Sequence, residues 1–65
     1  MSPKRLATVI TRLRGQETQE LLAKRAKVSR SYLAAIEAGH KKNPSLVVLR
    51  KLAKALGVPV TELLG

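Results

Sequence analysis

The hydrophobic residues of this chain recur every three or four positions, the spacing that places side chains on one face of an α-helix. Four stretches carry such a face, formed by Leu6, Val9, Ile10 and Leu13, by Leu22 and Ala26, by Leu33 and Ile36, and by Leu46, Leu49, Leu52, Ala53 and Leu56. Residues 58–64 are rich in hydrophobic residues and indicate a short fifth helix. No segment alternates as a strand does. The pattern therefore predicts a compact all-α domain of five helices.

Residues that begin and end helices border these stretches. Hydroxyl caps stand at the starts, at Ser2, Thr18, Ser29 and Ser45, and glycines follow three of the ends, at Gly15, Gly39 and Gly57. The second and third helices are separated by a few residues only, so residues 18–38 form a corner of two helices. Val28 can fill the angle between them, and the small Ala23 allows them to approach closely.

Length and composition exclude several classes of protein. Sixty-five residues are enough for one domain, which we expect to cover residues 1–65. Without cysteine the chain has neither disulfides nor thiolate metal sites, and no hydrophobic run reaches the length of a signal peptide core or a membrane span. We expect a cytoplasmic protein. One histidine and no aspartate cannot form a Ser-His-Asp triad, so we expect no enzyme activity, no cofactor, no metal and no small-molecule ligand.

Charge indicates the kind of partner. Thirteen lysines and arginines against four acids give a formal net charge of +9, and such self-repulsion accompanies a polyanion such as nucleic acid. Tyr32 is the only aromatic residue, so the chain lacks a platform for stacking single-stranded bases, and double-stranded DNA is favoured. We interpret four other basic side chains as solvated residues on the outer faces of helices: Lys24, Arg25, Lys51 and Lys54. Nonspecific RNA binding remains an alternative.

The corner and its surroundings resemble the helix-turn-helix domain of the Cro and phage-repressor type, also called the XRE family. The likeness covers about residues 6–64, and the matching positions are 18–20, 22–23, 26, 28–33, 36–37, 39, 43–46, 52–58 and 62–64. It implies a lambda-repressor-like fold in which the third helix enters the major groove and the second crosses above it. Lys27 departs from the pattern because the family often has glycine there, and a positive φ at this position would cost of order 1 kcal/mol.

The resemblance also implies DNA contacts by position. The positions that face bases are Arg30, Ser31 and Ala35, with Ala34 at the edge of that face. The positions that touch phosphates are Gln19, Ser29, His40, Lys41, Lys42 and Asn43. Arg30 can pair with guanine O6 and N7, Ser31 can bond either kind of base, and Ala35 can meet a thymine methyl group. Phosphate contacts fix the position of the protein without reading sequence.

Three side chains have both structural and functional interpretations. The family places an ion pair between the first and third helices; Glu37 is its acid, and Arg14 is the first choice of partner, ahead of Arg12. A structural role is favoured, since a carboxylate facing DNA would repel phosphates. Tyr32 can cover the core with its ring or donate its hydroxyl to a phosphate. We include Tyr32 among the expected phosphate contacts. His40 lacks the partners of a metal site or pH switch, so a solvated or phosphate-near position is favoured.

A domain of this size reads about half of a symmetric site, so the resemblance implies a homodimer on a palindromic operator. We place the dimer contact on hydrophobic residues near the C-terminal end: Val58, Pro59, Val60, Leu63 and Leu64. The alternative is that these residues close the core. The patch is small, so we expect the dimer to be weak without DNA. The leading hypothesis is a sequence-specific DNA-binding transcription regulator, with repression favoured. The alternative from another class is a protein-interaction module of the same fold that does not read DNA.

Overall fold

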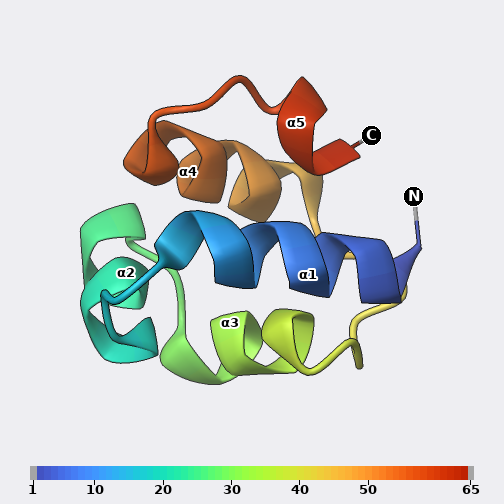
Figure 1. Ribbon diagram of the computed structural model, residues 1–65, viewed down its shortest axis with the longest axis horizontal. Helices are drawn as coiled ribbons and strands as arrows, with labels where there is room; N and C mark the ends of the chain where they lie inside the picture. The colour runs from blue at the N-terminus through green and yellow to red at the C-terminus, as the bar shows by residue number, and fades with distance from the viewer. Residues whose placement is uncertain (1, 65) are drawn as a thin grey trace.

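The computed structural model describes residues 2–64 as a bundle of helices (Figure 1). In chain order they are α1 Pro3–Arg14, α2 Gln19–Ala26, α3 Arg30–Glu37, α4 Leu46–Leu56 and α5 Thr61–Leu64. Within residues 2–64 there is no strand. The predicted all-α architecture with five helices is confirmed.

The expected caps account for the starts of the first four helices. Four hydroxyl oxygens accept a backbone N–H of the first turn, in the pairs Ser2 with Arg5, Thr18 with Leu21, Ser29 with Tyr32 and Ser45 with Val47. Donor–acceptor distances of 3.1 to 3.3 Å show that all four are ordinary hydrogen bonds. Each cap satisfies an N–H that has no partner inside its own helix.

The fifth helix is shorter than residues 58–64 because its predicted start belongs to the end of α4. Gly57 is left-handed, with φ 73°, and the Val58 amide donates to the Ala53 carbonyl at 3.0 Å. This pattern closes a helix that ends in a left-handed residue. Val58 is thus part of the α4 terminus, and α5 begins only at Thr61.

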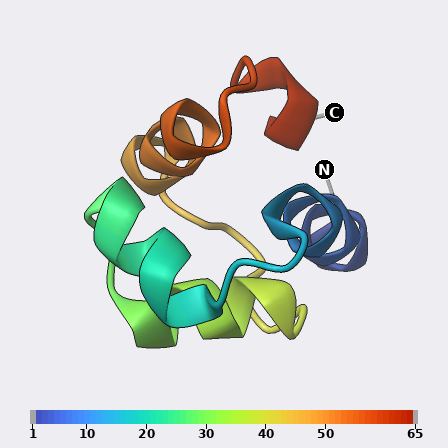
Figure 2. The same ribbon diagram turned by 60° about the vertical axis from the view of Figure 1, so that its left-hand side comes forward.

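The helices surround one core and leave α3 on one side of the molecule. α1 packs against α3 and α5, whereas α2 packs against α3 and α4. Both views place α3 at one edge and α4 at the opposite edge, with α2 closing one end (Figures 1 and 2). The buried core cluster consists of Leu6, Val9, Ile10, Leu22, Ala23, Ala26, Leu33, Ile36, Leu49, Leu52, Ala53 and Leu63.

Two residues assigned to inner faces lie at the surface instead. Leu13 is 36% exposed and Leu46 is 46% exposed. Both stand in a terminal turn, Leu13 at the end of α1 and Leu46 at the start of α4, where the helix extends past the core. Periodicity identifies the inner face of a helix but not how far its neighbours cover it. Ala7 and Val48 contribute to the interior in their place.

The corner between α2 and α3 contains the only non-glycine residue with positive φ among those described. Lys27 has φ 59° and ψ 44°, the left-handed region, and its N–H donates back to carbonyls of α2. Val28 follows and packs, half-buried, against the core. The corner therefore does need the positive φ that glycine adopts most easily, and Lys27 carries the cost.

We expect Lys27→Gly to raise the free energy of unfolding by about 0.5 to 1 kcal/mol, because relief of the left-handed strain exceeds the added entropy of the unfolded chain. Urea unfolding followed by circular dichroism measures the change. Lys24→Gly is the matched control: Lys24 lies inside α2, so that variant should lose about 1 kcal/mol. Destabilisation by both substitutions would contradict a strained corner.

Candidate nucleic-acid interface

The third helix presents a narrow outward face. Leu33 and Ile36 point into the core, with 0% and 1% of their surface exposed. On the other side Arg30 and Ser31 are exposed, and Ala34 and Ala35 are half-buried. All four predicted base-facing residues therefore lie on the outward side of α3. Apart from Arg30 they are short, which lets the helix backbone come close to a partner surface.

The start of α3 gathers two hydroxyl groups beside Arg30. Ser29 accepts the Tyr32 amide as the helix cap, and its Oγ lies 3.1 Å from the Oγ of Ser31. A hydroxyl can donate and accept at once, so the pair is a local hydrogen bond in the free protein. When Ser29 is the donor, the Ser31 hydroxyl keeps its own proton for another acceptor.

Tyr32 links α3 to the start of α4. Its hydroxyl accepts the backbone N–H of Ser45 at 2.8 Å, while its ring packs half-buried against the core. Lys41 Nζ lies 4.5 Å from the ring centroid, within the range of a cation–π contact. The phenolic proton is still available for donation. The ring covers the core, as one interpretation predicted. The other interpretation, that the hydroxyl donates to a phosphate, stays a prediction.

The loop between α3 and α4 carries the other predicted phosphate contacts. His40, Lys42 and Asn43 are exposed. Lys41 is half-buried, and its ammonium group lies over the Tyr32 ring. All four follow α3 after Ala38 and Gly39. The His40 amide donates to the Ala35 carbonyl at 2.9 Å, which ties the start of the loop to the predicted base-facing part of α3.

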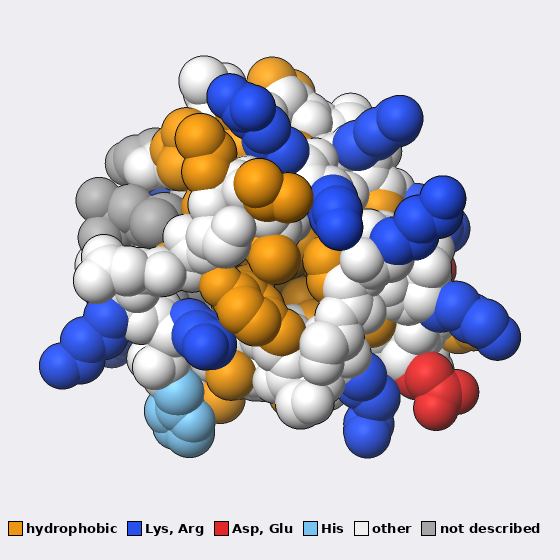
Figure 3. Space-filling view, turned by 180° about the vertical axis from the view of Figure 1, so that it is seen from behind, with side chains coloured by type: hydrophobic (Ala, Val, Ile, Leu, Met, Phe, Trp, Pro, Cys, Tyr) orange, Lys and Arg blue, Asp and Glu red, His pale blue; other side chains and the backbone are white. Residues whose placement is uncertain are grey.

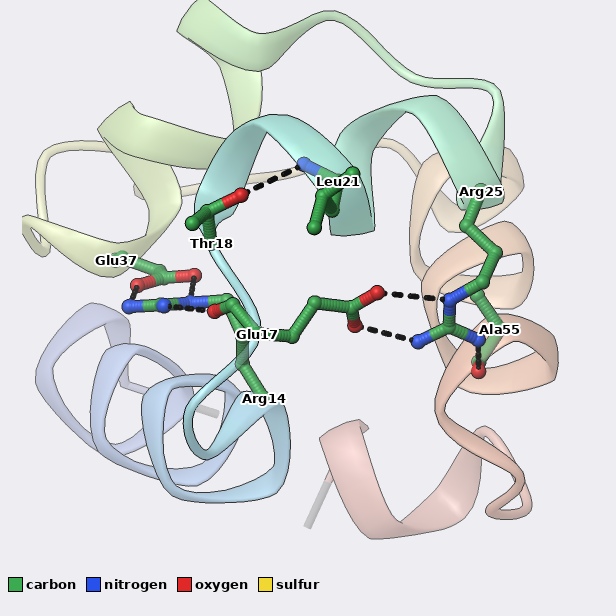
Figure 4. A network of polar contacts seen from close by, with 7 residues as sticks. All are labelled: Arg14, Glu17, Thr18, Leu21, Arg25, Glu37 and Ala55. Atoms are coloured by element: carbon green, nitrogen blue, oxygen red, sulfur yellow. Dashed lines mark hydrogen bonds and ion pairs between the residues drawn. The ribbon is translucent and has the colours of Figure 1, made fainter.

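A hydrogen-bonded carboxylate ties three helices together behind this face. Arg14 donates to both oxygens of Glu37 at 2.8 Å (Figure 4). Gln19 Nε2 donates to the same carboxylate at 3.1 Å. The Thr11 hydroxyl adds a contact at 3.3 Å. The expected ion pair between the first and third helices is present, with Arg14 as the partner. Gln19 braces α3 through this hydrogen bond, and its amide keeps a second hydrogen.

The ion pair is largely buried, which sets the charge state of both groups. The side chains of Arg14 and Glu37 are 17% and 5% exposed. Burial alone raises the pKa of Glu37, but the hydrogen bonds from Arg14, Gln19 and Thr11 outweigh it, so the net pKa lies below its ordinary value. The hydrogen bond to Glu37 in turn raises the pKa of Arg14. Both groups are charged at neutral pH.

A second ion pair was not expected from the sequence. Arg25, read as part of a solvated face, donates to the Glu17 carboxylate at 2.7 and 3.1 Å and also to the Ala55 carbonyl (Figure 4). The hydrogen bond from Arg25 lowers the pKa of Glu17. Arg25 thus joins α2 both to the preceding turn and to the end of α4. The pair has no helical spacing, so periodicity could not reveal it.

The predicted dimer patch needs one correction. Leu63 is 0% exposed and belongs to the core between α5, α1 and α4, because α5 docks through this residue. The alternative that it closes the core is therefore correct. Val58 and Val60 are half-buried against the core, whereas Pro59 and Leu64 are exposed. The surface left for a second copy consists of Pro59, Leu64 and the outer parts of the two valines.

A helix-turn-helix family model matches residues 12–63, most of the chain. The chain belongs to the helix-turn-helix family of the Cro and phage-repressor type. The resemblance seen in the sequence is thereby confirmed, and membership of this family of DNA-binding regulators confirms that the chain is not an enzyme.

Two relatives of this helix-turn-helix protein carry names that describe regulators. The chain is 50% identical over 48 residues to the immunity repressor protein of Bacillus phage phi105, a match that covers 74% of this chain and 33% of that protein. It spans about a third of the length of that relative. The crystal structure of the restriction-modification controller protein C.AhdI from Aeromonas hydrophila matches with TM-score 0.85 and 35% identity, over 94% of both chains.

The described part of this helix-turn-helix chain offers few other functional features. None of its helices has the length and hydrophobicity to cross a membrane. Residues 2–64 contain no group of three or more side chains of the metal-binding types. The outward face of α3 and the loop that follows it form the candidate site.

We expect Glu37→Gln to lower the free energy of unfolding by about 3 kcal/mol, since it leaves the Arg14 guanidinium largely buried without its counter-charge. Chemical unfolding at pH 7 gives the value. Glu20→Gln is the control, because Glu20 is exposed on α2 and its loss should change stability by less than about 0.5 kcal/mol.

The same variant has a pH signature. The folded pKa of Glu37 lies below its unfolded value, so its stabilisation is complete above about pH 4.3 and is lost as pH falls through the folded pKa. The stability difference between wild type and Glu37→Gln should accordingly shrink in acid. A difference that stays constant from pH 7 to pH 3 would show that charge is not what the substitution removes.

Proposed function

We propose that this helix-turn-helix protein is a sequence-specific regulator of transcription that places α3 in the major groove of double-stranded DNA. The observation that carries the proposal is the outward face of α3. A long guanidinium at Arg30 stands at the start of this face, and short side chains follow it, while the opposite face is buried. A helix of this shape fits the major groove, where base edges can be distinguished.

Charge supports the same assignment. The chain has a formal net charge of +9, and Lys41 and Lys42 lie with His40 in the loop that follows α3. Contacts to phosphates supply affinity and place the helix, whereas Arg30, Ser31, Ala34 and Ala35 supply the choice of sequence. Gln19 and Ser29 complete the phosphate contacts at the starts of α2 and α3, together with the Tyr32 hydroxyl and Asn43.

Repression is the favoured outcome of binding. The similar phage protein is named an immunity repressor, and the similar solved structure is named a controller protein. A small domain seated in the major groove with its phosphate contacts can exclude other proteins from the same site. We assign this mode of action to the present chain.

We expect selection from a random duplex pool to return a palindromic motif. On the selected site, Arg30→Ala should cost about 1 to 3 kcal/mol of binding free energy and relax the preference at one base pair, because a bidentate contact to guanine is lost. Fluorescence anisotropy on the selected site and on its single-base variants measures both effects.

Lys42→Ala is the matched control for this experiment. It removes a charge from the exposed loop, so it should weaken binding to the selected site and to random duplex by the same factor and reduce the salt dependence. A pool without an enriched motif would exclude sequence-specific reading. Equal losses on specific and random DNA for both variants would contradict the role of Arg30.

We further propose that two copies bind the palindrome and meet through Pro59, Leu64 and the outer parts of Val58 and Val60. Leu64 is 37% exposed, and Pro59 precedes α5 at the surface. One domain reads only a half-site of a few base pairs, which limits its specificity. Two copies related by a two-fold axis read both halves of a palindrome, and this gain in specificity supports the proposal. The small area favours a dimer that assembles on DNA.

Leu64→Gln should reduce cooperativity on a duplex with two half-sites by about tenfold, because both copies lose hydrophobic contact area. Gel-shift titrations on duplexes with one and with two half-sites measure it. Leu21→Gln is the control: Leu21 is also exposed, but on α2, and cooperativity should be unchanged. Equal cooperativity in the Leu64 variant and wild type would exclude this contact.

A further inference from the structure

A basic pocket lies between α2 and α4, and neither reading of DNA nor the dimer contact uses it. Its volume is about 410 Å³. Its lining consists of Arg25, Ala26, Lys27, Lys51, Lys54 and Ala55. Four of these six residues are cationic, and none of the lining residues is acidic. We propose that this pocket docks an acidic segment of a partner protein that carries hydrophobic side chains among its carboxylates.

The positive charge of the pocket is only partly balanced from within. Arg25 is held by Glu17 and by the Ala55 carbonyl, so its charge is already paired (Figure 4). Lys51 and Lys54 stand one helical turn apart on α4, and Lys27 lines the same pocket from the corner. The pocket is thus lined by three exposed lysines, for which no acidic residue stands in the lining, and this favours carboxylates in the occupant.

Lys27 adds an observation that charge alone does not provide. It keeps the left-handed conformation at φ 59°, where glycine would be free of strain. Strained residues gather at sites that bind, where the side chain itself is needed. Lys27 lines the pocket. A role of Lys27 in binding at the pocket would explain why a strained lysine stands at this position.

The α4 wall of the pocket stays open when DNA is bound. α4 lies at the edge of the molecule opposite α3, so a duplex against α3 approaches from the other side (Figures 1 and 2). Lys27, on the other wall, stands in the corner two residues before Ser29, so that wall adjoins the expected phosphate contacts. A partner in the pocket can therefore be held next to the operator.

The walls favour a peptide over a second nucleic acid. Ala26 and Ala55 contribute methyl groups to the pocket, and Ala26 is almost fully buried. On the face seen from behind, Lys and Arg side chains stand over α2 and α4 (Figure 3). A phosphate backbone has no hydrophobic group for such a surface, whereas an acidic peptide with aliphatic residues matches both parts.

The test uses the DNA-free protein and a fluorescein-labelled peptide in which glutamate and leucine alternate. Anisotropy titrations compare wild type with Lys51→Gln/Lys54→Gln and with Lys4→Gln/Arg5→Gln, which removes the same charge from α1. The pocket variant should lose about fivefold in peptide affinity, because two exposed ion pairs are removed, while the α1 variant loses less than about twofold. Circular dichroism verifies that both variants remain folded, and amide shifts of wild type on adding peptide should map to the pocket residues.

Four results would overturn the proposal. Equal losses in the two double variants would mean that only net charge attracts the peptide, and amide shifts centred on α3 would place it elsewhere. An all-glutamate peptide that binds as tightly as the mixed one would remove the hydrophobic part of the argument. If Lys51→Gln/Lys54→Gln weakens random duplex as much as peptide, the pocket serves nucleic acid. Because no operator is involved, the peptide titration stands or falls separately from the reading of DNA.

Discussion

The hydrogen bonds to the Glu37 carboxylate are the constraint on which the orientation of the outward face of α3 depends. Glu37 stands at the end of α3 and receives hydrogen bonds from Arg14 of α1 and Gln19 of α2, so one side chain fixes the rotation of α3 against both neighbours. Hydrophobic contacts of Leu33 and Ile36 hold α3 in place but tolerate small rotations, because packing is not directional. The directed bonds remove that freedom. The outward face of α3 therefore keeps one orientation.

Much of the fold could be predicted because short-range rules decide it. The caps at Ser2, Thr18, Ser29 and Ser45 and the inward positions of Leu33 and Ile36 depend on neighbours within one turn of helix. The resemblance supplied the pairing of Arg14 with Glu37, which are 23 residues apart and share no local pattern. The roles of Arg30, Ser31 and the loop residues rest on that resemblance and on their exposure.

The features that the sequence did not reveal depend on how helix ends meet. Leu13 and Leu46 follow the hydrophobic pattern yet stand beyond the covered part of their helices. Leu63 is buried because α5 docks through it, a fact of tertiary packing. Arg25 pairs with Glu17 and the Ala55 carbonyl across three segments, and a basic residue on an amphipathic helix gives no sign of such a partner.

The hydrogen bond from the Ser45 amide to the Tyr32 hydroxyl has a consequence for the speed of recognition. It ties the far end of the loop between α3 and α4 to α3, and the bond from the His40 amide to the Ala35 carbonyl ties its start, so the conformational freedom of the loop is already reduced in the unbound protein. Preorganised contacts need no slow rearrangement after the first encounter with a polyanion. Electrostatic attraction can then set the association rate, and the lifetime of the complex is left to the base contacts that we propose for α3.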